Sequence, residues 1–249
     1  FIDVSISDVA KNIPNQFKIL NLIFGCLGVI SISSLNFKAT LILTIFCVFF
    51  DFLDGFFARL LKVKSEFGKE LDSLADIVSF GLVPGFLMYK LYVMTGFQED
   101  FFLFFDFKIS YIALFGFLIT VSAMIRLAKF NLSKSQVSSF KGFPSPANAV
   151  FIVSIPIFFD SDFFNNTHQY LNIPTLTIIT LLSALMMNVN LTFIKISCDF
   201  SNKKNFFYSI VFLVLSAILI ILFMEAALTL IICVYILISF VDQIISKLK

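Results

Sequence analysis

The chain has 249 residues, of which 59% are hydrophobic and 14% are charged, and its mean hydropathy is +0.99. A soluble domain carries about 25% charged residues, and a globule of this length has no core large enough to bury so much apolar surface, which excludes soluble, fibrous and disordered proteins. The net charge of +2, spread among many loops, gives no indication of a nucleic-acid partner. The composition therefore indicates an integral membrane protein.

Eight apolar stretches follow one another along the chain, and about 20 apolar residues suffice to cross a bilayer as a helix. They cover residues 17–35, 39–60, 71–92, 109–129, 147–160, 174–195, 206–224 and 226–245. The stretch at 147–160 is short, and only Glu225 separates the last two, so seven helices is the alternative count. We predict an all-α fold, a polytopic membrane helix bundle of about eight transmembrane helices.

The two ends of the chain differ in character from its middle. Residues 1–16 mix apolar with charged side chains, a pattern typical of an interfacial segment. This segment has neither a cationic start nor a small-residue cleavage site, and we expect no signal peptide. Residues 206–245 are nearly free of polar groups and are predicted to be extra C-terminal helices. No linker or repeat divides the chain, so residues 1–249 are expected to form a single domain.

The distribution of basic residues predicts how the bundle is oriented. With eight spans both termini lie on one side of the membrane, and 15 of the 18 Lys and Arg residues fall on that side. The opposite side holds only Lys38, Lys90 and Lys108. Because basic loops stay in the cytoplasm, we expect both termini and the even-numbered connections to be cytoplasmic.

Four aspartates gather where the second span ends and the third begins. Asp51 and Asp54 are three residues apart and share one helical face, and Asp72 and Asp76, four apart, share a face of the next helix. A short loop joins the two helices, so both pairs are expected to converge at the cytoplasmic interface. Carboxylates this close repel one another and are costly to desolvate unless cations compensate them. All-oxygen ligands favour Mg²⁺, Mn²⁺ or Ca²⁺ over zinc.

The residues between the two pairs suit a phosphate-bearing ligand. Gly55 and Ala58 leave their helix face without bulk, and Arg59 offers a fork that matches phosphate. The alternative is that the aspartates are solvated helix ends paired with nearby lysines. Asp72 alone fits that alternative, whereas Asp51 and Asp54 lie in an apolar run, where ionisable residues are usually functional. The metal-site interpretation is therefore favoured.

These positions match the motif D-x2-D-G-x2-A-R-x8-G-x3-D-x3-D of the CDP-alcohol phosphatidyltransferases, which the sequence resembles. The matching residues are Asp51, Asp54, Gly55, Ala58, Arg59, Gly68, Asp72 and Asp76. The resemblance implies a six-helix catalytic core, usually in a homodimer. It also implies that the four aspartates bind two divalent ions, Mg²⁺ or Mn²⁺, that Gly55, Ala58, Arg59 and Gly68 bind the CDP-lipid, and that Asp76 is the general base.

Further segments resemble the bacterial CDP-diacylglycerol–serine O-phosphatidyltransferases, or phosphatidylserine synthases. They are IPNQFKILNLIFG at 13–25, SFGLVPGFLMY at 79–89, RLAKFN at 126–131 and FKGFPSPANA at 140–149. The resemblance runs from about residue 12 to 150 and weakens beyond. The sequence departs from this subfamily at Lys18, where threonine is usual, and at Lys129, where arginine is usual. We expect neither lysine to touch the aspartates.

This resemblance implies transfer of the phosphatidyl group of CDP-diacylglycerol to L-serine, at the cytoplasmic face of a bacterial inner membrane. The serine carboxylate needs a cation, and Arg126, Lys129 and Asn131 are the candidates, although Lys129 serves equally as a positive-inside anchor. Two alternatives stay open. Another acceptor, such as glycerol 3-phosphate or an inositol phosphate, calls for a denser basic cluster. An ion channel or transporter calls for polar residues through the membrane midplane, whereas here they gather at the cytoplasmic ends.

Overall fold

The computed structural model describes residues 6–63, 65–95, 101–104, 107–132, 142–161, 171–189, 191, 193 and 203–247. Within these ranges the chain is mainly helical, which confirms the predicted all-α membrane bundle. The helices are α1 (Ile6–Ser33), α2 (Phe37–Leu60), α3 (Glu66–Asp76), α4 (Val83–Met94), α5 (Leu118–Leu132), α6 (Ser145–Asp160), α7 (Ile173–Asn188), α8 (Lys203–Phe223) and α9 (Ala227–Lys247). A small antiparallel hairpin, β1 (Phe101–Phe104) and β2 (Phe107–Ser110), was not predicted from the sequence.

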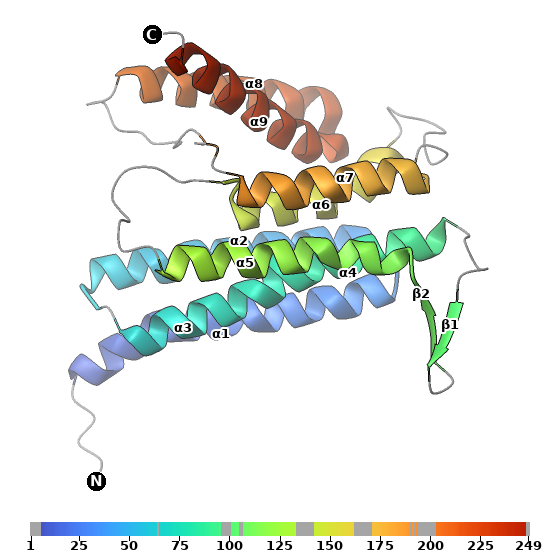
Figure 1. Cartoon of the computed structure of the whole chain (residues 1–249). Helices are drawn as coiled ribbons and strands as arrows, with labels where there is room; N and C mark the ends of the chain where they lie inside the picture. Colours follow the sequence, from blue (N-terminus) through green and yellow to red (C-terminus); the bar gives the residue numbers. More distant parts are fainter. Residues whose placement is uncertain are drawn as a thin grey trace.

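Eight apolar helical segments correspond to the eight predicted spans. Five of them have the length and composition to cross a membrane: Asn12–Ser33, Phe37–Leu60, Glu66–Met94, Ala113–Leu132 and Ala227–Ile244. Three apolar helices are shorter: Ser145–Asp160, Ile173–Asn188 and Tyr208–Phe223. The chain is therefore an integral membrane protein. Inside the described ranges, α1 begins and α9 ends at the same end of the bundle, as an even number of spans requires (Figure 1).

The helices form stacked layers (Figure 1). Helix α1 packs against α2, α3 and α4, while α5 packs against α7, and α9 packs against α6 and α8. The main core lies among α4, α5 and α6, where Leu87, Ile119 and Ile152 are fully buried. The outer helix α8 exposes large apolar side chains, including Leu213 and Ile221, which suits contact with lipid.

The expected interfacial segment at 1–16 is in large part helical. Residues 1–5 lie outside the described ranges, and from Ile6 onward the segment continues into the first span as a single helix, α1, with Pro14 inside it. The interfacial position of this helical start stays a prediction.

Helices α3 and α4 belong to one continuous helical rod with an irregular turn in its middle. A π-helical turn at Ile77–Leu82 follows Asp76 directly, and Pro84 lies in the first turn of α4. Proline has no N–H and clashes with the carbonyl one turn earlier, and a π turn relieves that clash while keeping the chain helical. Such turns are frequent at functional sites, and this one begins immediately after the last aspartate of the motif.

Candidate metal centre and active site

The residues between α2 and α3 explain how the chain ends one helix and begins the next. Helix α2 ends at Leu60, and Lys62 then adopts the left-handed region at φ +53°, which turns the chain back. The Ser65 side chain caps the next helix by accepting a hydrogen bond of 2.9 Å from the Gly68 amide. Both helices pack against α1, which therefore supports the site.

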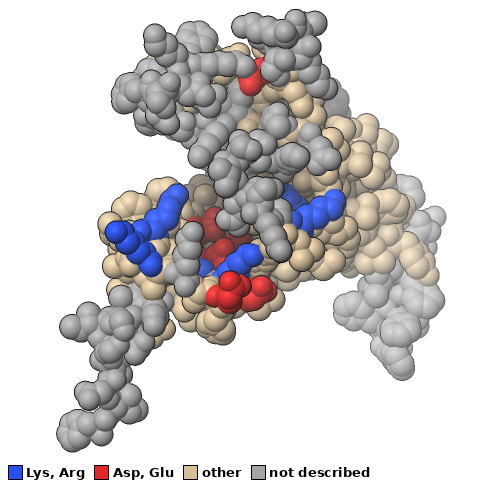
Figure 2. All heavy atoms as spheres, turned by 60° about the vertical axis from the view of Figure 1, so that its left-hand side comes forward, with Lys and Arg blue, Asp and Glu red and all other residues tan. Residues whose placement is uncertain are grey.

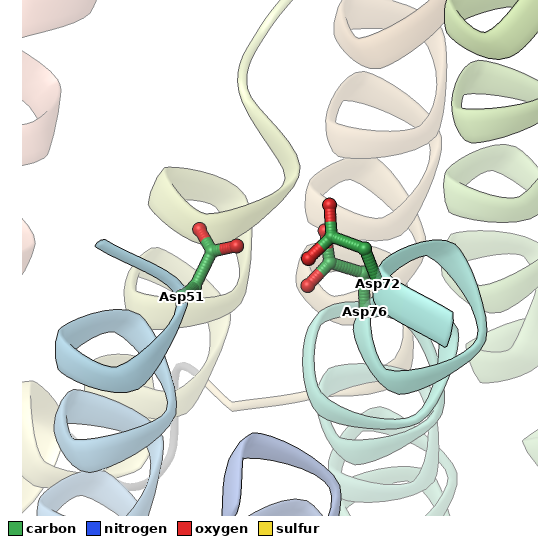
Figure 3. A group of neighbouring side chains, drawn as sticks. All are labelled: Asp51, Asp72 and Asp76. Atoms are coloured by element: carbon green, nitrogen blue, oxygen red, sulfur yellow. The ribbon is translucent and has the colours of Figure 1, made fainter. Parts of the chain in front are cut away.

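Three carboxylates of the motif meet between α2 and α3. Asp51 extends from α2, and Asp72 and Asp76 extend from α3 toward it (Figure 3). One oxygen from each of these carboxylates lies within 4.8 Å of the other two. The convergence predicted from the two helical spacings is thus confirmed for three of the four aspartates. A group of three carboxylate oxygens at this separation can hold a divalent metal ion.

The burial of the cluster also fits a cation. Asp54 and Asp76 are only 4% and 8% exposed. In the part of the chain that the structure describes, the buried oxygens Asp54 Oδ2 and Asp72 Oδ1 accept no hydrogen bond. Buried carboxylate oxygens without a donor are costly, and a nearby positive charge, from a bound ion or a lysine ammonium, lowers that cost. The residues present therefore fit a divalent ion with oxygen ligands, such as Mg²⁺ or Mn²⁺.

Lys18 lies inside this cluster, so the expectation that it does not touch the aspartates was wrong. Its ammonium nitrogen lies 3.5 Å from Asp54 Oδ2 and 4.0 Å from Asp72 Oδ1. It also donates a hydrogen bond of 2.6 Å to the Gly68 carbonyl. The sequence spacing of about 50 positions hides this contact, because only the packing of α1 against α3 brings Lys18 to the site.

Asn21 is a site residue that the sequence reasoning missed. Its side-chain amide donates a hydrogen bond of 3.1 Å to Asp76 Oδ1, and it is 1% exposed. The Ser79 hydroxyl in turn donates to the Asn21 carbonyl at 3.0 Å. Asn21 therefore orients the Asp76 carboxylate. The sequence carries one indication of this role, because Asn21 is a polar residue one turn after Lys18 in an otherwise apolar span.

The small residues of the motif occupy two different environments. A Cβ built on Gly55 meets nothing within 4 Å, so the backbone there is open to a ligand. Ala58 is half-buried, and the exposed Arg59 donates from Nε to the Gly55 carbonyl at 3.0 Å. Gly68 is buried instead, and a Cβ there would lie 2.8 Å from Ser65 Oγ and 3.1 Å from Asn15 Oδ1.

These environments predict opposite effects of adding a methyl group. Gly68→Ala displaces the Ser65 hydroxyl that caps α3, which costs about 1 kcal/mol, or a fall of about 2–4 °C in the thermal unfolding midpoint. Gly55→Ala has free space and a better helix former, and is expected to leave the midpoint unchanged or raised. Thermal unfolding of both variants in detergent measures this. Equal midpoints for Gly68→Ala and the parent chain would contradict it.

The three candidates for the serine carboxylate lie at the end of α5. Arg126 donates to Ser145 Oγ at 2.7 Å, its Nε is buried without a hydrogen-bond partner in the described residues, and it interacts electrostatically with Asp76. The exposed Lys129 lies 3.5 Å from Asn188 Oδ1. Asn131 ties α5 to α3, since its amide donates to Ser73 Oγ at 2.7 Å and its carbonyl accepts from Lys69 at 3.0 Å. Of the three, Arg126 is the one whose charge lies within electrostatic range of an aspartate of the cluster, Asp76.

Charged side chains gather on the face at this end of the bundle. Figure 2 shows acidic side chains at its centre and basic side chains on both sides of them. Such an arrangement suits a ligand that brings negative phosphates together with divalent cations.

Comparison with known proteins assigns the chain to a family. A family model described as CDP-alcohol phosphatidyltransferase matches residues 11–194, which is most of the chain. The CDP-diacylglycerol–serine O-phosphatidyltransferase of Bacillus subtilis is 33% identical over 135 residues, which are 54% of this chain and 69% of that protein. The protein of the same name from Helicobacter pylori is 37% identical over 142 residues, covering 56% of this chain and 55% of its own length.

An archaeal relative carries a related name. The archaetidylserine synthase of Methanothermobacter thermautotrophicus is 34% identical over 144 residues, covering 57% of this chain and 56% of that protein. The chain thus spans little more than half the length of the Helicobacter and Methanothermobacter relatives that it matches.

Proposed function

The chain belongs to the CDP-alcohol phosphatidyltransferase family, and on that premise we propose that it transfers the phosphatidyl group of CDP-diacylglycerol to L-serine, giving phosphatidylserine and CMP. The observation that carries the proposal is the meeting of the motif aspartates between α2 and α3. The serine acceptor is supported by the names of the bacterial and archaeal relatives.

The aspartates are proposed to hold divalent cations, Mg²⁺ or Mn²⁺. Asp51, Asp72 and Asp76 would hold one ion, and Asp54, on α2 with its Oδ2 3.5 Å from the Lys18 ammonium, is the fourth carboxylate proposed to bind cations. When bound, such ions polarise phosphoryl oxygens and stabilise the charge on departing CMP. Gly55, with open space above its backbone, and the neighbouring Ala58 and Arg59 would receive the nucleotide end of the lipid. Gly68 is proposed to act by shaping the wall of the site.

Asp76 is proposed as the general base. The serine hydroxyl oxygen forms a bond to the β-phosphorus, the bond between that phosphorus and the CMP oxygen breaks, and the hydroxyl proton passes to the Asp76 carboxylate. Asn21 holds one oxygen of Asp76 by its hydrogen bond of 3.1 Å, which leaves the other to face the acceptor. A base held in this way contributes about 10²–10⁴-fold to the rate.

Arg126 is proposed to bind the serine carboxylate, with Lys129 and Asn131 further along the same helix. Arg126→Ala is then expected to raise the KM for serine far more than the KM for the CDP-lipid, because it removes a charged partner of the acceptor alone. The matched control is Ser145→Ala, which removes the 2.7 Å hydrogen bond to Arg126 but keeps the guanidinium. An equal rise in both KM values for Arg126→Ala would instead assign Arg126 to the pyrophosphate.

The acceptor is tested by following CMP release from CDP-diacylglycerol with one acceptor at a time. We expect release with L-serine in Mg²⁺ or Mn²⁺, and none after a chelator removes the ions. Release with glycerol 3-phosphate or inositol phosphate, but not with serine, would replace the proposed acceptor. If no acceptor gave CMP release, the result would contradict a transferase activity and favour the alternative of a transporter.

We also propose the membrane location, the domain organisation and the oligomeric state of the enzyme. The excess of Lys and Arg on the side of both termini supports a cytoplasmic active site in a bacterial inner membrane. Residues 1–249 are proposed to act as one domain, in which 206–245 are extra helices outside the six-helix core. The family resemblance supports a homodimer, which cross-linking in native membranes would test.

A further inference from the structure

Two features of the acidic cluster bear on how many cations it holds. Asp51, Asp72 and Asp76 each offer a carboxylate oxygen within 4.8 Å of the other two. The Lys18 ammonium lies 3.5 Å from Asp54 Oδ2 and 4.0 Å from Asp72 Oδ1, two carboxylate oxygens of the motif that are buried without a hydrogen bond in the described residues. A second divalent ion bound at Asp54 would therefore lie next to the positive charge of Lys18.

The ammonium group is held in this place by more than the carboxylates. Its hydrogen bond of 2.6 Å to the Gly68 carbonyl ties it to the backbone of α3, and its side chain is only 11% exposed. A Cβ built on Gly68 would lie 3.5 Å from Lys18 Nζ, an ordinary van der Waals distance, so the ammonium group packs directly against this turn of α3. Lys18 is thus a fixed component of the site.

We propose that Lys18 takes the place of a second divalent ion in the free protein. This inference rests on the proposed metal centre. One divalent ion at Asp51, Asp72 and Asp76, together with Lys18, offsets most of the carboxylate charge. A second ion would lie close to the ammonium group and be repelled by it. The free protein therefore binds one divalent ion tightly and a second one only weakly.

The test is Mn²⁺ binding to the purified chain without substrate, measured by the electron paramagnetic resonance signal of free Mn²⁺. We expect one tight ion per parent chain. Lys18→Met keeps the length of the side chain but removes its charge, and is expected to strengthen binding of the second ion by at least about tenfold. Lys18→Arg keeps the charge and should leave the second site weak.

The matched control is Lys69→Met. Lys69 lies on α3 one residue from Gly68, but its ammonium group donates to the Asn131 carbonyl at 3.0 Å, and no ion pair joins it to the four aspartates in the described residues. Its loss is expected to leave both Mn²⁺ affinities unchanged. A stronger second site in Lys69→Met would show that any lost positive charge has this effect and would overturn the assignment to Lys18.

A second readout covers the folding of the variant. Without metal, Lys18→Met removes the positive charge next to Asp54 and Asp72, so its unfolding midpoint in chelator should fall below that of the parent chain, and Mn²⁺ should restore it. Unchanged Mn²⁺ binding together with a raised KM for CDP-diacylglycerol would overturn the inference and make Lys18 a phosphate ligand. Failure of the parent chain and all variants to bind Mn²⁺ would instead contradict the metal centre itself.

Discussion

Asp51→Asn and Asp72→Asn are each expected to abolish CMP release while the protein stays folded in the membrane. The two side chains lie on different helices, α2 and α3, and share the one group of carboxylate oxygens close enough to hold a metal ion among the described residues. An amide in place of either carboxylate removes a charged metal ligand, and with it the stabilisation of the departing phosphate. It removes no apolar packing, so folding should persist.

Both variants are measured by CMP release at saturating Mg²⁺ or Mn²⁺, with a thermal unfolding curve for each. Glu70→Gln is the matched control, since Glu70 is an exposed acidic residue on the same helix as Asp72, and residues two positions apart on a helix do not share a face. It should keep the activity of the parent chain. Near-normal release by Asp51→Asn or Asp72→Asn at saturating metal would show that the cluster is not the metal centre.

Asp76→Asn is expected to separate binding from catalysis. The amide keeps the shape of the side chain and an oxygen that Asn21 can still reach, but it cannot accept the serine proton. We expect metal-dependent binding of CDP-diacylglycerol to persist, while transfer to serine becomes about 10²–10⁴-fold slower. A carboxylate beside divalent cations stays ionised, which keeps the parent residue ready to take that proton.

Calorimetric titration with CDP-diacylglycerol, alongside single-turnover CMP release, decides between the two roles of Asp76. Slow release with binding retained assigns the base. If binding disappears together with release, Asp76 is chiefly a metal ligand. The comparison with Asp72→Asn is informative here, because both residues lie on α3 and contribute to the same group of oxygens, and only Asp76 is oriented by Asn21.

The features that the sequence predicts correctly are those that depend on neighbours along the chain. A run of apolar residues forms a membrane helix whatever surrounds it, so the apolar segments and the membrane class follow from composition and length. The spacings of Asp51 from Asp54, and of Asp72 from Asp76, place each pair on one helical face. A short connection between α2 and α3 then leaves these faces close enough to meet.

Local irregularities were harder to predict. The π-helical turn after Asp76 depends on how the chain relieves the clash before Pro84, and apolar periodicity does not distinguish it from an ordinary helix. The hairpin of β1 and β2 lies between spans, where the sequence carries no alternating pattern strong enough to predict strands.

The roles of Lys18, Asn21 and Gly68 were decided by the tertiary structure alone. Lys18 lies 50 positions from Gly68, and Asn21 lies 55 positions from Asp76. Helical periodicity predicts which residues share a face, but the rotation of α1 against α3 depends on the packing of every side chain between them. That packing places an ammonium group and an amide among the aspartates, and it makes Gly68 a buried contact point instead of an open surface for phosphate.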